Sequence, residues 1–287
     1  MELHSNSIET STTDLLHRIL SDEPGEMFIV HPEKEVVEAL CEVLKEMDTP
    51  PKIRLLAQES VLKDIRRNYR TASAAADLVE DRTLSLRTTD EIPTNSLVVT
   101  DESIVALVST GTQIAGLVTD DSEFAESARE HWQSVWESAE GFDLRTPGRS
   151  RVENTLSEEF GPEEATDFQT MIDALATARG SEDGDGTGSR ARDGLTEVGV
   201  SLLMAARHGE LLYDISTWGE DVGLASRATF SRVKTQLEEQ GLITTEKVPL
   251  DVGRPRLRLW LGDEDLRETD ATELVSGAHG RLTRTEA

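Results

Sequence analysis

Apolar residues show two alternating patterns over roughly the first third of the chain, one typical of strands and one typical of helices. Short apolar runs typical of buried strands lie at 27–30, 52–57 and 83–86. Apolar residues at helical spacing lie before and between these runs, at 12–20, 32–44 and 60–78. Strands that alternate with helices favour a parallel sheet with right-handed crossovers. We therefore predict that the chain opens with a parallel α/β arrangement.

The hydrophobic pattern changes in the next part of the chain. Three apolar runs, at 96–100, 104–109 and 113–118, follow one another across short gaps. Such gaps are too short for parallel crossovers, which need a dozen or more residues. The pattern predicts an antiparallel meander, with a hairpin turn at Thr110–Gly111.

Helical spacing returns after residue 194 in three short stretches. Leu195–Ala206 is the first predicted helix, and Ser216 is the predicted cap of a second. Gly223–Leu224 forms a predicted tight turn, where glycine allows a positive φ. Ser226 is the predicted cap of a third helix over Arg227–Gln240.

Strand-like segments accompany these helices. Leu211–Tyr213 is a predicted very short strand, and Leu242–Val248 and Arg256–Leu261 are two longer ones, joined by the loop Pro249–Pro255. Helix, helix, turn, helix and hairpin in this order are typical of a winged helix-turn-helix, which inserts its recognition helix into a DNA groove.

The third predicted helix has one apolar face, formed by Phe230, Val233 and Leu237. The opposite face is small at its N-terminal end and can enter a major groove, where arginine binds guanine with two hydrogen bonds. Arginines of the hairpin suit phosphate or minor-groove contact. We assign base reading to Arg227, Ser231 and Arg232, backbone positioning to Lys234, Arg254, Arg256 and Arg258, and further DNA contacts to Ser226, Ala228 and Thr235.

The predicted fold class is α+β, with an N-terminal mixed α/β domain (parallel strands, then the antiparallel meander) and a C-terminal winged helix-turn-helix. A Gly-, Ser- and Asp-rich stretch separates the two, and such compositions are typical of flexible linkers. We predict an α/β effector and dimerisation domain over 1–140, a helical connector over 141–179, a flexible linker over 180–194, the winged helix-turn-helix over 195–262 and a polar, mobile tail over 263–287.

The charge of the chain sharpens this interpretation. Asp and Glu number 56 against 29 Lys and Arg, a net charge of −27. Molar salt screens the repulsion among so many carboxylates, so we expect an acidic protein of a halophilic organism. Such a charge disfavours non-specific nucleic-acid binding by the whole surface. Between Ala225 and Leu261, however, seven basic residues outnumber four acidic ones, and this is the segment assigned to DNA.

Several other classes of protein do not fit the sequence. No apolar run is long enough to span a membrane, no signal peptide is evident, and the single Cys41 excludes an intramolecular disulfide, so we expect a cytoplasmic protein. The six histidines show no HxxxH pairing, and there is no CxxC, so we expect no metal and no cofactor. No GxGxxG or Walker loop follows a predicted strand, and no GxSxG occurs, so we expect no enzyme. His31 ends a strand, where it is either structural or in contact with a ligand.

These observations favour a homodimeric regulator that binds double-stranded promoter DNA. Its α/β domain would dimerise and sense a small metabolite or a partner, and two winged helices would bind a palindromic site. Two alternatives stay open: an interaction adaptor whose winged helix binds protein, and an α/β enzyme with a DNA-binding tail. The operator, the effector and the direction of regulation are not encoded in recognisable motifs.

The segments YDISTWGEDV, GLASRATFSRVKTQLEEQGLI and GRPRLRLWL (213–261), with SLVVTDESIVALVSTGTQIAGLVTDD (96–121), resemble the TbsP family of haloarchaeal transcription regulators. The resemblance covers nearly the whole chain and implies a haloarchaeal regulator tied to sugar metabolism. The N-terminal half is distantly similar to the effector domains of TrmB-type sugar-responsive regulators, which are related to phospholipase D folds. In the phospholipase D motif one residue separates His and Lys, whereas two separate His31 from Lys34 here, and the Asp is missing. TrmB-type regulators also carry their DNA-binding domain first.

Overall fold

The computed structural model describes residues 6–22, 25–180, 194–250, 254–262 and 264–284. The chain forms two compact units, residues 1–148 and 149–287. The predicted flexible linker lies almost wholly outside the described residues.

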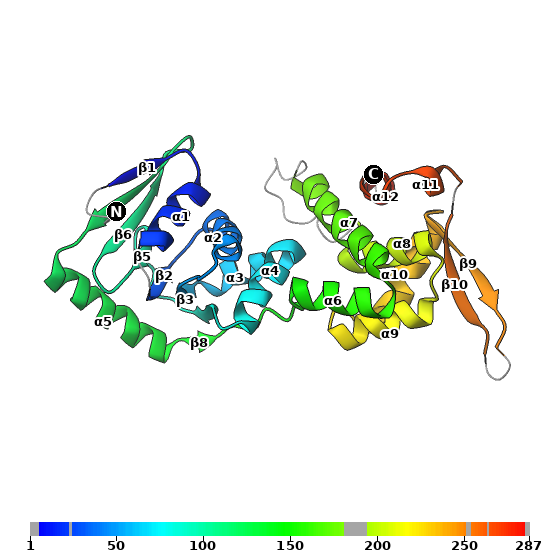
Figure 1. The fold of residues 1–287 in the computed structure, drawn as a ribbon, viewed down its shortest axis with the longest axis horizontal. Helices are drawn as coiled ribbons and strands as arrows, with labels where there is room; N and C mark the ends of the chain where they lie inside the picture. Colours follow the sequence, from blue (N-terminus) through cyan, green and yellow to red (C-terminus); the bar gives the residue numbers. More distant parts are fainter. Residues whose placement is uncertain (1–5, 23–24, 181–193, 251–253, 263, 285–287) are drawn as a thin grey trace. The chain divides into compact units, whose positions relative to one another are not determined.

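The first unit is a mixed α/β domain (Figure 1). Its strands are β1 Ser7–Glu9, β2 Glu26–Val30, β3 Lys52–Ala57, β4 Leu84–Thr88, β5 Ser96–Val99, β6 Ile104–Ser109, β7 Ile114–Thr119 and β8 Glu140–Gly141. Its helices are α1 Thr12–Asp22, α2 Lys34–Glu46, α3 Glu59–Arg67, α4 Tyr69–Glu80 and α5 Ser122–Ser138.

The eight strands form one sheet in the order β1-β7-β6-β5-β2-β3-β4-β8. Strands β2, β3 and β4 are parallel, with Ile29 opposite Leu55 and Leu55 opposite Leu86. The remaining pairs are antiparallel, and β5, β6 and β7 form the predicted meander. The mixed fold class is therefore confirmed. The edge strands β1 and β8 were not predicted, because two or three residues carry too little periodicity and their partners are distant in sequence.

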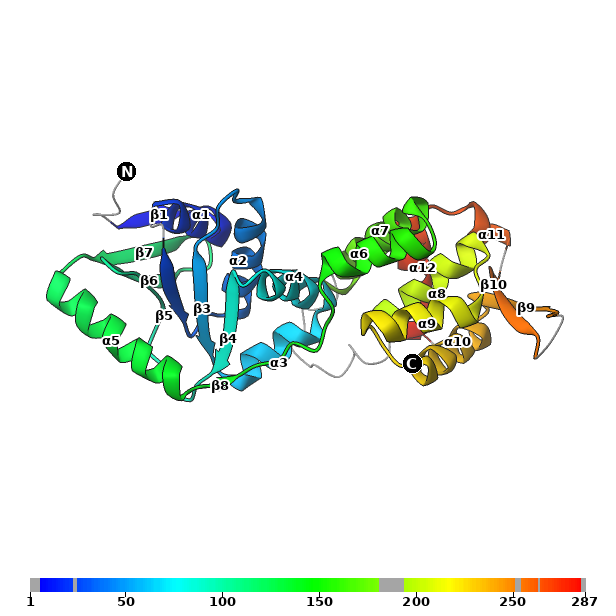
Figure 2. The ribbon, with the colours of Figure 1, turned by 60° about the horizontal axis from the view of Figure 1, so that its bottom comes forward.

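Helices cover the two faces of the sheet unequally (Figures 1 and 2). Helices α1 to α4 lie on one face and enclose the larger core, in which Leu15, Leu40 and Ile65 are buried. Helix α5 lies on the other face and packs Trp132 and Trp136 against the sheet. The helix predicted over 60–78 is two helices, α3 and α4, because the backbone leaves the helical conformation at Asn68.

The second unit is helical apart from one hairpin. Its elements are α6 Arg149–Glu159, α7 Pro162–Gly180, α8 Glu197–His208, α9 Leu212–Val222, α10 Arg227–Glu239, β9 Ile243–Val248, β10 Arg256–Leu261, α11 Glu264–Glu268 and α12 Ala271–Arg284. Helix α8 is buried almost along its whole length, from Val198 to Ala206. The Thr196 side chain caps it by accepting a hydrogen bond from the Gly199 amide over 3.3 Å.

Two segments of this unit differ from the sequence-based prediction. The predicted connector is not a separate segment, because α6 and α7 pack on α8, α9 and α12 and belong to the second unit. The predicted polar, mobile tail is wrong for its larger part. Residues 271–284 form α12, which buries Leu274, Val275 and Leu282, and α12 packs on α7. Within the described residues, no helix combines the length and the apolar character needed to cross a membrane.

Candidate nucleic-acid interface

Helix α10 starts where the sequence predicted. The Ser226 hydroxyl accepts a hydrogen bond from the Thr229 amide over 3.3 Å and caps the helix. Phe230, Val233 and Leu237 are buried, which fixes the rotation of the helix about its axis. The residues left exposed on the opposite side are Arg227, Ala228, Ser231, Arg232 and Thr235.

Helix α9 starts a turn earlier than predicted. It begins at Leu212, so Ser216 lies inside the helix, where its buried hydroxyl donates to the Tyr213 carbonyl over 3.1 Å. Of the predicted short strand, only Leu211 makes a β-bridge, with Arg258. Gly223 ends α9 with a φ of 87°, as the predicted turn requires.

Strands β9 and β10 form the wing, with Arg256 opposite Val248 and Leu261 opposite Ile243. Leu259 and Leu261 are buried. The arginines of the wing differ in exposure: Arg254 is exposed, whereas Arg256 and Arg258 are half-buried. Residues 251–253 of the predicted loop lie outside the described residues.

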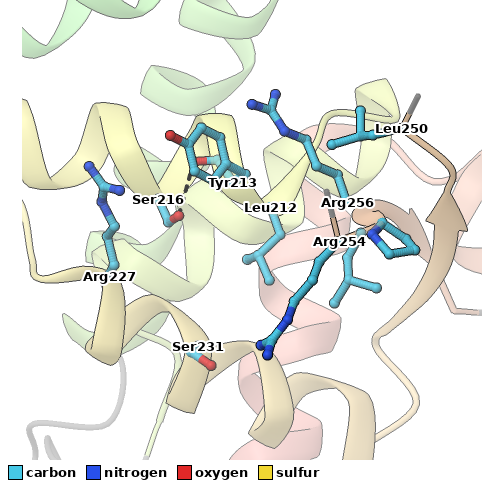
Figure 3. Close-up of a pocket in the computed structure, with 10 residues that line it drawn as sticks. Leu212, Tyr213, Ser216, Arg227, Ser231, Leu250, Arg254 and Arg256 are labelled. Carbon is cyan, nitrogen blue, oxygen red and sulfur yellow. Dashed lines mark hydrogen bonds between the residues drawn. The ribbon is translucent and has the colours of Figure 1, made fainter. Parts of the chain in front are cut away.

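A hollow of about 480 Å³ separates the start of α10 from the wing (Figure 3). Helix α9 supplies Leu212, Tyr213 and Ser216 to its lining, and α10 supplies Arg227 and Ser231. The wing and the segments beside it contribute Leu250, Arg254, Pro255, Arg256 and Leu257. The structure thus brings three predicted arginines and Ser231 together around one concave surface.

Sequence reasoning missed Tyr213, which lies between two of these arginines. The guanidinium of Arg256 lies over the Tyr213 ring, 4.1 Å from its centroid, and that of Arg227 lies 5.7 Å from it. Cations are attracted to the face of an aromatic ring, so the ring helps to hold both side chains. The sequence pattern does not predict this cluster, because Tyr213, Arg227 and Arg256 belong to three different elements.

Each of these two arginines also contacts a carboxylate of α9. Arg227 Nε lies 2.8 Å from Glu220 Oε2, and Arg256 Nη1 lies 3.1 Å from Asp214 Oδ1. Arg232 and Arg254, in contrast, form no ion pair with any described residue. The face predicted to bind DNA therefore carries two kinds of arginine, paired and unpaired.

Lys234 is placed differently from the other predicted contacts. Its Nζ lies 2.6 Å from Glu238 Oε2, and its side chain is only 14% exposed. Glu238 also accepts a hydrogen bond from Thr245 of β9 over 2.8 Å. Burial raises the pKa of Glu238, but hydrogen bonds from Lys234 and Thr245 and the Lys234 charge outweigh it, and the pKa is lowered. Glu238 thus links α10 to the wing through Thr245, and Lys234 pairs with Glu238 within the helix.

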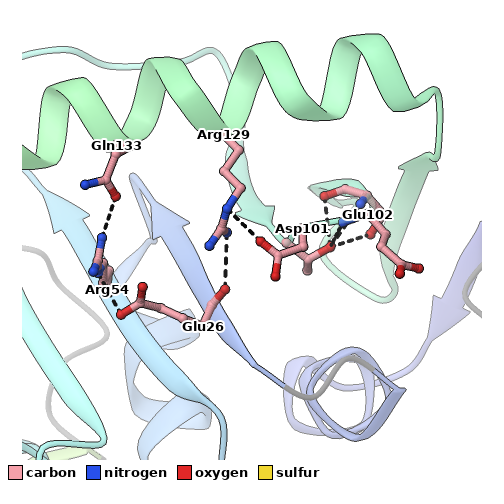
Figure 4. Close-up of polar contacts among 8 residues, drawn as sticks. Glu26, Arg54, Asp101, Glu102, Arg129 and Gln133 are labelled. Carbon is pink, nitrogen blue, oxygen red and sulfur yellow. Dashed lines mark hydrogen bonds and ion pairs between the residues drawn. The ribbon is translucent and has the colours of Figure 1, made fainter.

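The first unit uses its arginines to fasten α5 to the sheet (Figure 4). Arg54 of β3 contacts Glu26 over 2.9 Å and donates to Gln133 of α5. Arg129 of α5 lies 2.7 Å from Asp101 and donates to the Glu26 carbonyl over 3.2 Å. These contacts give Arg54 and Arg129 a structural role, the attachment of α5 to the sheet.

His31 follows β2 with a φ of 51°, a conformation that is uncommon for residues other than glycine. Its amide donates to the Leu56 carbonyl over 2.7 Å, and its carbonyl accepts from the Ser96 hydroxyl, also over 2.7 Å. Both contacts are made by the backbone, whereas the buried ring Nδ1 has no hydrogen-bond partner among the described residues, and a ligand contact of the ring stays a prediction. Among the described residues, no three His, Cys, Asp or Glu side chains are grouped so that they could hold a metal ion.

Comparisons with solved structures find low similarity. TrmBL2, named an archaeal chromatin protein with a novel mode of DNA binding, is 16% identical with a TM-score of 0.38, over 50% of this chain and 56% of that one. Nuc of Salmonella typhimurium, a phospholipase D family member, is 15% identical with a TM-score of 0.34, over 48% of this chain and 97% of its own. NucT of Helicobacter pylori is 15% identical with a TM-score of 0.33, over 48% and 99%. At these values the likeness carries no argument about function.

Comparisons with protein families identify the family of the chain. No curated protein matches the chain. Residues 4–147 match the family described as transcriptional regulator TbsP-like, N-terminal. Residues 148–279 match the family described as transcriptional regulator TbsP-like, C-terminal HTH domain, where HTH denotes helix-turn-helix. The two matches follow one another along nearly the whole chain, which therefore belongs to the TbsP-like transcriptional regulators.

Proposed function

We propose that the protein regulates transcription by binding double-stranded DNA, with α10 in the major groove and the wing beside it. The observation that carries this proposal is the hollow between α10 and the wing, around which Arg227, Arg254 and Arg256 gather in a segment where basic residues outnumber acidic ones. Arg227, Ser231 and Arg232 read base edges, and the wing arginines contact phosphates. Neither unit is assigned a catalytic step.

The test is a mobility-shift titration on genomic fragments in potassium chloride. The Arg227→Ala/Arg232→Ala variant is expected to lose sequence-selective binding, since a bidentate arginine–guanine pair contributes about 1–3 kcal/mol of discrimination. The control is Arg67→Ala/Arg70→Ala, which removes two exposed arginines from the first unit. Unchanged selectivity in the first variant refutes the assignment of α10. Failure of the native protein to bind any fragment favours the protein-binding adaptor.

The same proposal includes a homodimer, since two-fold proteins bind palindromic sites. Exposed apolar residues at one side of the first unit's sheet support it: Ile8 of β1 is 64% exposed and Leu117 of β7 is 46% exposed. Light scattering after size-exclusion chromatography is expected to give the dimer mass for the native protein. Ile8→Ser/Leu117→Ser is expected to shift the mass toward the monomer, and an unchanged dimer would place the interface elsewhere.

Halophily, sugar control and the effector complete the proposal. The net charge of −27 supports work in the salt-rich cytoplasm of a halophilic archaeon. Sugar control and a metabolite effector of the first unit follow from family resemblance. Mapping of bound genomic sites with and without sugar in the growth medium tests both, and occupancy that does not change with sugar contradicts them. A ligand that the protein consumes instead of merely binding would favour an enzyme.

A further inference from the structure

Two acidic residues lie among the arginines of the proposed DNA-binding face. We propose that Glu220 and Asp214 are built-in counterions of Arg227 and Arg256, which a DNA phosphate or base displaces, and that this exchange weakens the salt dependence of DNA binding. The proposal rests on the proposed function and adds two positioning residues to it.

The pairs are placed so that such an exchange is possible. Arg227 and Glu220 are each 45% exposed, while Arg256 and Asp214 are 35% and 40% exposed, so an incoming ligand can reach all four side chains. Helix α9 carries both carboxylates, Asp214 in its first turn and Glu220 in its last. The Tyr213 ring lies against the guanidinium of Arg256, whereas Asp214 contacts its Nη1, so release of Asp214 does not require the ring contact to break.

The consequence follows from how salt acts on DNA binding. Each phosphate that a protein cation neutralises releases condensed counterions, so log Kobs falls with log salt by about 0.9 per contact. When a paired arginine binds DNA, its freed carboxylate attracts a cation from solution and offsets part of this release. Arg254, which is assigned to phosphate contact and has no carboxylate partner among the described residues, contributes in full.

A quantitative expectation follows. Removing both carboxylates steepens the salt slope by up to about 1.8, the limit at which each freed carboxylate takes up as many cations as one neutralised phosphate releases, about 0.9. Over a tenfold rise in potassium chloride, the affinity advantage of such a variant over the native protein therefore falls by up to about 60-fold. At the lowest salt the variant binds more tightly, and the two binding curves converge as salt rises.

The experiment is a fluorescence-anisotropy titration of a labelled genomic fragment between about 0.1 and about 1 M potassium chloride. It compares the native protein with Glu220→Gln/Asp214→Asn. The matched control, Glu153→Gln/Glu158→Gln, removes the same charge from two exposed residues of α6 that pair with no cation within the described part of the chain. A steeper slope in the first variant alone supports the proposal, and equal slopes in all three proteins overturn it.

Three further measurements separate a structural effect from the proposed one. Circular dichroism checks that each protein is folded at each salt concentration. Glu220→Asp keeps the charge and is expected to keep the native slope. In the native protein, the Arg227 Nε–Hε resonance is expected to shift when DNA binds, because its partner changes, and an unshifted resonance in a formed complex contradicts the exchange. If the native protein binds no DNA at any salt, the proposed function itself fails.

Discussion

Trp218 of α9 donates a hydrogen bond from its indole Nε1 to the Thr155 hydroxyl of α6, over 3.1 Å. The indole is 1% exposed and meets the rings of Phe160 and Phe168 edge-on. One side chain thus joins the helix-turn-helix to the two helices that precede it. Helices α6 and α7 are therefore packed together with the helix-turn-helix in the second unit.

Replacing this anchor is expected to destabilise the second unit strongly. Trp218→Ala leaves a cavity and is expected to lower the free energy of unfolding by about 3–5 kcal/mol. Urea denaturation followed by far-UV circular dichroism measures it. The control is Trp260→Ala on the wing, where the side chain is 36% exposed and a clearly smaller loss is expected. Equal losses would mean that Trp218 is not an anchor.

Gly219 allows the close approach of α9 and α10. A Cβ at this position would lie 2.3 Å from Cζ of the buried Phe230 ring. Gly219→Ala is expected to lower stability by about 1–3 kcal/mol, because the ring must move in a packed core, and to weaken DNA binding with it. Gly277→Ala is the matched control in α12, where a Cβ meets nothing within 4 Å. Gly277→Ala is expected to raise the free energy of unfolding by about 0.5–1 kcal/mol. Calorimetry then shows a loss of stability for one variant and a gain for the other.

The lowered pKa of Glu238 predicts how acid affects the wing. The ionised carboxylate stabilises the fold fully above the ordinary pKa of 4.5, and this contribution is lost as the pH falls through the lower folded-state value. Urea titrations at several pH values are expected to show a steeper loss of stability below about pH 5 for the native protein than for Glu238→Gln. Glu239→Gln, at an exposed neighbouring position, is expected to keep the native profile. Identical profiles for all three proteins would contradict the role of Glu238.

Cys41 is expected to be unreactive in the folded protein. Burial raises the pKa of its thiol to about 12, so almost no thiolate forms near neutral pH. Iodoacetamide at about pH 8 is expected to modify the thiol only after denaturation, as mass spectrometry can show. Rapid labelling of the native protein would mean that α2 opens readily.

The segments predicted best from the sequence carry their own local signals. Arg227–Gln240 was predicted as the third helix and α10 spans Arg227–Glu239, because Ser226 caps it and its apolar residues recur at helical spacing. Strand β10 was also predicted with its observed bounds, Arg256–Leu261, where leucines alternate with arginines. In both cases, local propensity and packing favour the same structure.

The structure differs from the sequence-based prediction where contacts between distant residues determine the local conformation. Tyr213 follows two leucines and resembles a strand residue, yet only Leu211 pairs with the wing, and Tyr213 lies in α9. The apolar residues of α12 gain their significance only against α7. The pairing of Arg227 with Glu220 spans a turn between helices, and that of Arg256 with Asp214 spans 42 residues. Periodicity cannot report such contacts, since it compares only near neighbours.

The strand order has a practical consequence for fusion proteins. The β1 strand lies at one rim of the sheet, and β8, from which the polypeptide continues toward the second unit, lies at the opposite rim. Seven spacings of about 4.8 Å separate these rims, or about 34 Å across the sheet. A fluorescent or affinity tag attached ahead of β1 therefore starts at the rim opposite β8, and it lies beside Ile8 of the proposed dimer surface, so an untagged N-terminus is the favoured choice for measuring the dimer mass.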